Sequence, residues 1–191
     1  GPLALTTGTV QISDKAAVEA ALATYDLLST EAQALLATEK ALLDSLLAEI
    51  LSLEGVSAEV SNFETTHAGV LAETTGTIQI SDKAAVEAAL AAYDLLSTEA
   101  QALLATEKAL LDSLLVEIQA QEAIALEVST FQTDYAGPLA LTTGTVQISD
   151  KASVEAALAA YDLLSTEAKA DLATEKALLD SLLAEIETQQ L

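Results

Sequence analysis

The feature that most constrains the fold is a nearly exact internal repetition with a period of 68 residues. Three copies of one 42-residue segment cover residues 9–50, 77–118 and 145–186. The second copy differs from the first at three positions and the third differs at four. A fixed period of this size indicates one structural unit per repeat, with the units stacked on each other. The repetition therefore overrides the one or two globular domains that 191 residues would otherwise suggest.

The first half of each copy has the pattern of an amphipathic helix. In the first copy Ser13-Asp14 offers an N-cap, and apolar side chains then recur every three or four residues from Val18 to Leu28. Ala and Leu dominate the apolar residues, and both have high helix propensity. The pattern predicts a helix over about 14–28, with counterparts over 82–96 and 150–164, and an all-α fold class.

The second half of each copy predicts another helix. Ser29-Thr30-Glu31 supplies a cap with an acid in the first turn, where the helix dipole favours it. Apolar residues then continue at helical spacing from Leu36 to Ile50. We expect this helix over about 30–52, 98–120 and 166–188, joined to the first by a tight turn between Leu28 and Glu31.

The two connectors between the copies, 51–76 and 119–144, match at only 13 of 26 positions, yet both carry a third helical pattern. Its last two apolar positions are Phe63 and His67 in the first connector and Phe131 and Tyr135 in the second. We call this third segment helix C, and its apolar spacing predicts it over about 56–68 and 124–136. Gly69 and Gly137 fit a C-terminal stop. The TTGTVQI segment that follows predicts an extended loop with at most a short strand.

Two helices alone cannot bury an apolar face on both sides, so helix C is expected to complete a three-helix bundle. No strong helix breaker precedes it, so it can continue the preceding helix for about 40 residues and pack on the next hairpin. Alternatively, the polar step Gln119–Glu122 is a turn, and helix C folds back onto its own hairpin. The apolar phase slips across this step, which slightly favours the second path. In both cases the expected architecture is a row of three-helix bundles forming an elongated rod.

This arrangement predicts repeats over 1–72, 73–140 and 141–191. Only two helices C are present for three hairpins, so one terminal hairpin is expected to lack its third helix. Asp171 stands where the other copies have Leu35 and Leu103, and an aspartate in a packed seam is costly. The third repeat is therefore the expected incomplete one.

The charge of the chain excludes several classes of partner. Thirty acidic residues face seven basic ones, all of them Lys, for a net charge of −23. Such a field repels nucleic acid, whose phosphates are bound by clustered Lys and Arg. No apolar run is long enough for membrane insertion of this segment, and the absence of Cys leaves no disulfide or thiolate metal site.

Catalytic and metal-binding patterns are weak. Glu64 and His67 have the ExxH spacing of di-iron bundles, but those sites need two such motifs, and the other connector has Gln132 and Tyr135 there. His67 is the only His, so a nucleophile with a His base is not expected either. We therefore predict no enzyme activity, no cofactor and no metal site.

Glu39 lies between Leu36 and Leu43 at the spacing of residues that pack between helices, and its two copies have the same neighbours. They are expected to be partly buried. One interpretation is a contact with Lys15 or Lys40 that sets the register of the helices, and the other is a carboxylate that reaches out to water at the edge of the seam.

The string TVQISDKAAVEAALATYDLLSTEAQALLATEKALLDSLLAEI resembles the Ala-rich, acidic tandem helical repeats of very large bacterial surface and adhesin proteins. The resemblance covers nearly the whole chain and rests on the caps, the Tyr-Asp-Leu-Leu-Ser turn and the tandem layout. It implies a secreted or cell-surface protein in which the repeats space a binding head from the cell. It carries over no ligand-binding residue.

The alternative is an adhesin module that binds a protein, a cell-wall component or a second copy of itself through a helix face. The aromatic anchors available for such a partner are in the variable connectors: Phe63, His67, Phe131 and Tyr135. Exposed rings would favour binding, and buried rings would favour a spacer.

Overall fold

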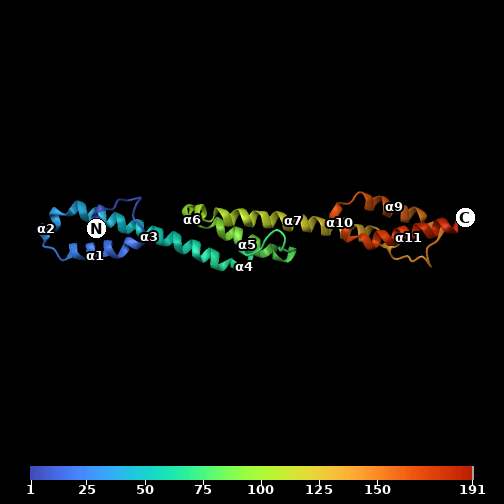
Figure 1. Cartoon of the computed structure of the whole chain (residues 1–191), viewed down its shortest axis with the longest axis horizontal. Coiled ribbons are helices and arrows are strands. Elements are labelled where there is room, and N and C mark those ends of the chain that lie inside the picture. The colour runs from blue at the N-terminus through green and yellow to red at the C-terminus, as the bar shows by residue number, and fades with distance from the viewer. Residues whose placement is uncertain (191) are drawn as a thin grey trace. The chain divides into compact units, whose positions relative to one another are not determined.

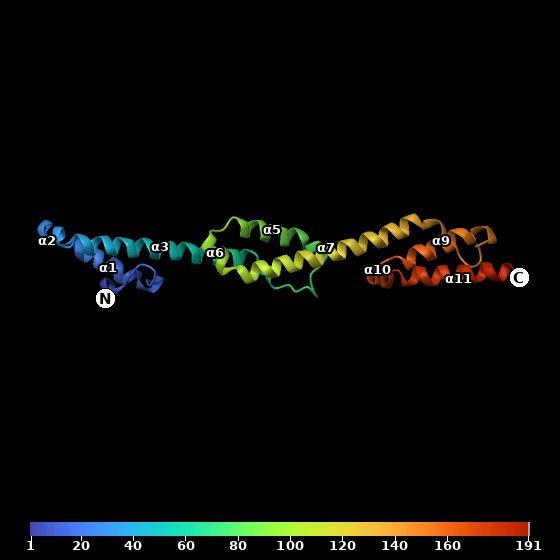
Figure 2. The ribbon, with the colours of Figure 1, turned by 90° about the horizontal axis from the view of Figure 1, so that it is seen from above.

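The computed structural model describes residues 1–190, and in this range the chain is all-helical, as the sequence predicts (Figures 1 and 2). Helices take up 79% of the chain, and the described part contains 11 α-helices and no strand. The chain divides into two compact units, residues 1–74 with 84–113 and residues 75–83 with 114–191.

The first hairpin lies in the first unit. Helix α1 (Lys15–Asp26) packs along the first half of α3 (Ala37–Thr66), and the short helix α2 (Thr30–Leu35) lies between them in the sequence (Figure 1). The Ser29 side chain accepts a hydrogen bond from the backbone N–H of Ala32, which confirms the predicted second cap. Buried residues shared by the loop, α1 and α3 form the core of this hairpin: Val10, Val18, Leu43, Leu46 and Ile50.

The other two copies repeat these elements at the expected spacing. The second comprises α5 (Lys83–Asp94), α6 (Thr98–Leu103) and the first half of α7 (Ala105–Asp134). The third comprises α9 (Lys151–Asp162), α10 (Thr166–Asp171) and α11 (Ala173–Gln189). In each copy a single leucine, at 36, 104 or 172, interrupts what the sequence predicts as one helix.

The segments expected as helix C, 56–68 and 124–136, are helical up to Thr66 and Asp134 and continue the preceding helix, which is the first of the two expected paths. Helices α3 and α7 are each 30 residues long without interruption, so the expected fold-back at Gln119–Glu122 does not occur. The slip in apolar phase has another cause. The first half of each helix buries its apolar face against its own hairpin, and the second half buries a different face against the next hairpin, where α3 packs on α6.

The end of helix C also differs from the expectation. Gly69 and Gly137 do not stop the helix, since they lie inside the one-turn helices α4 (Ala68–Leu71) and α8 (Ala136–Leu139). Pro138 fits in α8 because the first turn of a helix needs no N–H from it.

The TTGTVQI segments contain no strand. In the first copy Gly8 has a φ of +88°, which glycine adopts without strain, and its N–H donates to both carboxylate oxygens of Glu49 at 2.8 and 3.0 Å. Val10 then enters the core, and a 3-10 turn, η2 (Ile12–Asp14), leads into α1. Asp14 caps this turn by accepting a hydrogen bond from the Gln11 N–H at 3.0 Å. The same turn recurs as η3 (Ile80–Asp82) and η4 (Ile148–Asp150).

The third hairpin was expected to lack a helix C, but one packs on it. Phe131 of α7 belongs to the same core cluster as Val154 and Leu182, so helix C covers this copy. Leu35 and Leu103 are strongly exposed, and Asp171 therefore replaces a leucine that faces water rather than one in a seam. The expectation built on Asp171 is wrong for this reason.

Candidate interaction surface

The second halves of α3 and α7 bring the aromatic candidates together in two matching clusters. The Phe63 ring lies 4.9 Å from that of His67 and 6.2 Å, edge-on, from that of Tyr93 on the following hairpin. Phe131 repeats this arrangement at 5.2 Å from Tyr135 and 6.2 Å from Tyr161. Each phenylalanine therefore packs helix C against the hairpin that follows it in the sequence.

The four residues proposed for partner contact differ in exposure. Phe63 and Phe131 are buried, while His67 and Tyr135 are half-buried at the edge of the seam. In this fold only the latter two rings present an edge to solvent. Binding of a partner by any of the four stays a prediction.

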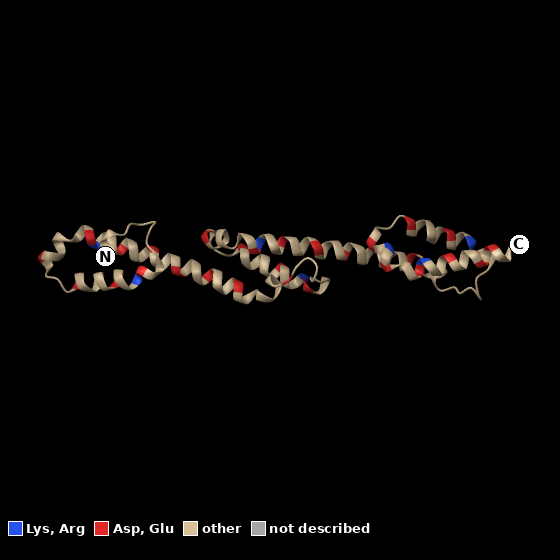
Figure 3. Ribbon diagram, in the orientation of Figure 1, with Lys and Arg blue, Asp and Glu red and all other residues tan. Residues whose placement is uncertain are grey.

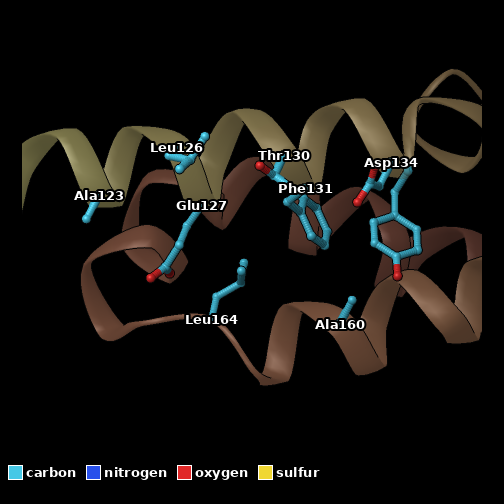
Figure 4. Close-up of a pocket in the computed structure, with 9 residues that line it drawn as sticks. Ala123, Leu126, Glu127, Thr130, Phe131, Asp134, Ala160 and Leu164 are labelled. Atoms are coloured by element: carbon cyan, nitrogen blue, oxygen red, sulfur yellow. The ribbon is translucent and has the colours of Figure 1, made fainter.

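An open apolar hollow of about 530 Å³ lies between α7 and α9 in the second unit (Figure 4). The labelled Phe131 ring points from α7 toward α9, and Ala160 and Leu164 face it from the other side. Leu126, on the α7 side, is strongly exposed, and Glu127 and Asp134 are also among the lining residues. This surface can hold an apolar side chain, but it gathers no set of groups for acid-base or nucleophilic chemistry.

Two glutamates that the sequence analysis missed fix helix C to the turn of the next hairpin. Glu59 accepts hydrogen bonds from the Ser97 hydroxyl at 2.7 Å and the Ser97 N–H at 2.9 Å, and Glu127 accepts from the Ser165 N–H at 2.9 Å. These bonds stabilise the ionised form and hold the pKa of both carboxyls below the ordinary value of 4.5. A signal was present in the sequence, because Glu-Val-Ser-x-Phe recurs in both connectors although they otherwise diverge over most of the helix C segment.

The Glu39 position is partly buried in all three copies, as expected, but the lysine contact proposed for it is wrong. Lys15 pairs with Glu54 at 2.6 Å and Lys40 pairs with Asp44 at 2.6 Å. In the third copy Glu175 accepts instead from the Gln132 amide at 2.8 Å. In the second copy one oxygen of Glu107 is buried with no partner in the described chain.

Every lysine of the chain has a partner on the protein itself. Lys40, Lys108 and Lys176 each pair with the aspartate four residues later, and each ammonium group is also about 6 Å from the centre of a tyrosine ring. Lys15 and Lys83 pair with glutamates across the base of a hairpin. Lys151 lies near Gln190 and Glu155, and Lys169 donates to the carbonyl of Asp162. Acidic residues greatly outnumber these cations along the helices (Figure 3).

Within residues 1–190, no group of three or more His, Cys, Asp or Glu side chains is placed to hold a metal ion. The Glu64–His67 pair therefore stays without further ligands in the described chain. No helix in this range has the length and apolar character needed to cross a membrane.

Comparison with known proteins does not place the chain in a family. No family model, no curated protein and no solved structure matches the chain.

Proposed function

We propose that the chain is a structural spacer: a series of three-helix bundles in which helix C of one repeat completes the bundle of the next, so that each copy adds length to a rod. The observation that carries this proposal is the continuous helix α3, which packs on α1 with its first half and on α6 with its second. A helix shared between consecutive units favours extension over collapse, because a 30-residue helix is about 45 Å long and does not bend back on itself.

The chemistry of the surface supports a non-catalytic role. The lysines are engaged on the chain itself, and the excess of carboxylates makes neighbouring copies of the chain repel each other. Together with the resemblance to bacterial surface repeats, this favours a secreted or cell-surface stalk that holds a binding head away from the cell.

Solution scattering on chains of one, two and three repeats tests the spacer. We expect the maximum dimension to grow by a constant increment per added repeat while the cross-sectional radius stays the same. A three-repeat chain with the radius of gyration of a compact globule of equal mass, about 16 Å for 191 residues, would contradict the proposal.

The second candidate is an adhesin module, favoured by the hollow between α7 and α9 and its exposed Leu126. A cell-binding assay that compares the parent chain with a Leu126→Glu variant tests it. Ala58 occupies the equivalent position in the first connector, so Ala58→Glu is the matched control. Binding that is lost only with the first substitution supports the module, and equal binding of all three chains contradicts it.

A further inference from the structure

In the second and third copies helix C packs on one surface of the hairpin, which we call the seat. The first hairpin has the same seat, but within residues 1–190 no helix C packs on it. Leu36 is 38% exposed, whereas its counterparts Leu104 and Leu172 are 1% and 0% exposed. Ala21 and Ala32 are likewise only half-buried, although the alanines at both equivalent positions of the other hairpins are fully buried. The difference marks the face that helix C covers in the second and third copies.

The uncovered face contains a hollow where a phenylalanine ring lies in the other copies. It has a volume of about 270 Å³ and is bordered by Ala21, Tyr25, Leu28 and Leu36. In the second copy the counterpart of Tyr25 is Tyr93, whose ring packs edge-on against Phe63. The hollow thus has the walls of the phenylalanine site without the ring.

The polar half of the seat is open as well. Ser97 and Ser165 each bind a helix C glutamate through the backbone N–H. Ser29, at the same position, is exposed, and within residues 1–190 no carboxylate accepts from its N–H. A helix that enters the seat would meet an unused donor at the place where Glu59 and Glu127 meet theirs.

One end of the seat is already filled. Gly1-Pro2-Leu3-Ala4 has the sequence of residues 137–140, and its short helix η1 (Pro2–Ala4) packs on α1 and α3. Leu3 lies at the border of the hollow, as Leu139 lies against the core of the third copy. The open part is therefore the part that takes the glutamate and the phenylalanine.

We propose that the first hairpin binds an amphipathic helix with the helix C pattern Glu-x3-Phe-x3-aromatic, which this chain carries as Glu59–Phe63–His67 and Glu127–Phe131–Tyr135. The same interface is present twice within the chain, so the fit of this sequence to this seat is already established. The occupant is a helix of this pattern that does not already pack on another hairpin. This inference does not depend on the spacer role.

The test uses the full chain and a synthetic peptide of residues 120–136 with a fluorescent label. We expect saturable binding of one peptide per chain, with a gain in helicity because a peptide of this length is marginally helical alone. The same peptide with Phe131→Ala should bind at least about tenfold more weakly, since it loses the ring that fills the hollow.

Two variants of the chain locate the binding. Leu36→Asp should abolish it, and Ala21→Glu, which blocks the hollow from α1, should do the same. Leu35→Asp is the matched control, because residue 35 is exposed and the third copy carries Asp171 there; it should bind like the parent. The absence of saturable binding overturns the proposal. Binding that survives both blocking substitutions also overturns it, since the peptide would then be displacing a resident helix C elsewhere.

Discussion

At the scale of single residues, positions 64 and 132 place different side chains at the same point of the repeat. Gln132 donates to Glu175, while Glu64 stands at the equivalent position for Glu107, whose buried oxygen has no partner in the described chain. A carboxylate cannot donate to another carboxylate, whereas an amide can. Within residues 1–190 the second copy therefore lacks a hydrogen bond that the third copy has.

The substitution Glu64→Gln should supply this donor and stabilise the chain by about 0.5–1 kcal/mol, the usual net value of one such bond. Chemical denaturation of the full chain, compared at its midpoint, measures the change. The mirror substitution Gln132→Glu should destabilise by a similar amount. If Glu64→Ala stabilises as much as Glu64→Gln, relief of repulsion and not the new bond is responsible.

A second residue-scale prediction concerns Glu59 and Glu127, whose pKa values are lowered by their bonds to Ser97 and Ser165. A carboxyl with a lower pKa in the folded state binds fewer protons there than when unfolded. Its contribution to stability is therefore complete above the ordinary value of 4.5 and is lost as the pH falls through the lower, folded value.

The double variant Glu59→Gln with Glu127→Gln should accordingly be less stable than the parent near neutral pH, and the difference should shrink below about pH 4. Denaturation midpoints of both chains across the range from about pH 3 to pH 7 give this difference directly. The double variant Glu19→Gln with Glu87→Gln, at two exposed positions, serves as the control for removal of two acids. A difference that stays constant with pH would mean that ionisation of these carboxyls does not stabilise the fold.

At the scale of elements, each hairpin tip is closed by hydrogen bonds between its tyrosine and the short helix that follows. The Tyr25 hydroxyl donates to the Gln33 carbonyl at 2.9 Å, and the Gln33 amide donates back to the Tyr25 carbonyl at 3.1 Å. The third copy has Lys169 in place of Gln33. Its ammonium group donates to the Asp162 carbonyl at 2.8 Å, so the substitution keeps the tip closed with a different donor.

The continuity of α7 predicts how proline substitutions act. Ala120→Pro lies inside α7, removes one helical hydrogen bond and should cost about 3 kcal/mol with a loss of helicity by circular dichroism. In a fold-back structure residue 120 would lie in a turn and tolerate proline. Thr98→Pro is the matched control, because it is the first residue of α6 and the preceding Ser97 already has the extended backbone that proline requires. Equal effects of the two substitutions would contradict a continuous helix.

The sequence predicts the helices of the hairpins, the Ser29 cap and the apolar face of helix C, because all three depend on residues close together in the chain. The path of helix C depends on contacts 30 to 40 residues away and is not encoded locally. A slip in apolar phase at Gln119–Glu122 has the same appearance whether the chain turns or the helix changes partners. The candidate site shares this limit: the positions of Phe63 and Phe131 follow from spacing, but their burial depends on which hairpin covers them.

At the scale of the whole molecule, charge is the property that every repeat shares. The chain has thirty acidic residues and seven lysines, and six of these lysines form ion pairs at partly exposed positions. Exposed pairs of this kind contribute little to stability, typically below about 1 kcal/mol each. The surplus of carboxylates repels itself more strongly in the folded chain than in the expanded unfolded chain. Repulsion, rather than attraction between opposite charges, therefore dominates the response to salt.

The chain should accordingly become more stable as NaCl is raised. From about 10 mM to 150 mM salt the screening length falls from about 30 Å to about 8 Å, which removes most repulsion between separate carboxylates. We expect the thermal midpoint near neutral pH to rise by about 3 °C or more, which corresponds to roughly 1 kcal/mol for a chain of this size. Near pH 4, where many carboxylates are protonated, the same salt step should have a smaller effect, and this serves as the internal control. A midpoint that falls with salt at neutral pH would mean that the lysine pairs outweigh the repulsion, and the charge surplus would then not be the dominant electrostatic term in this fold.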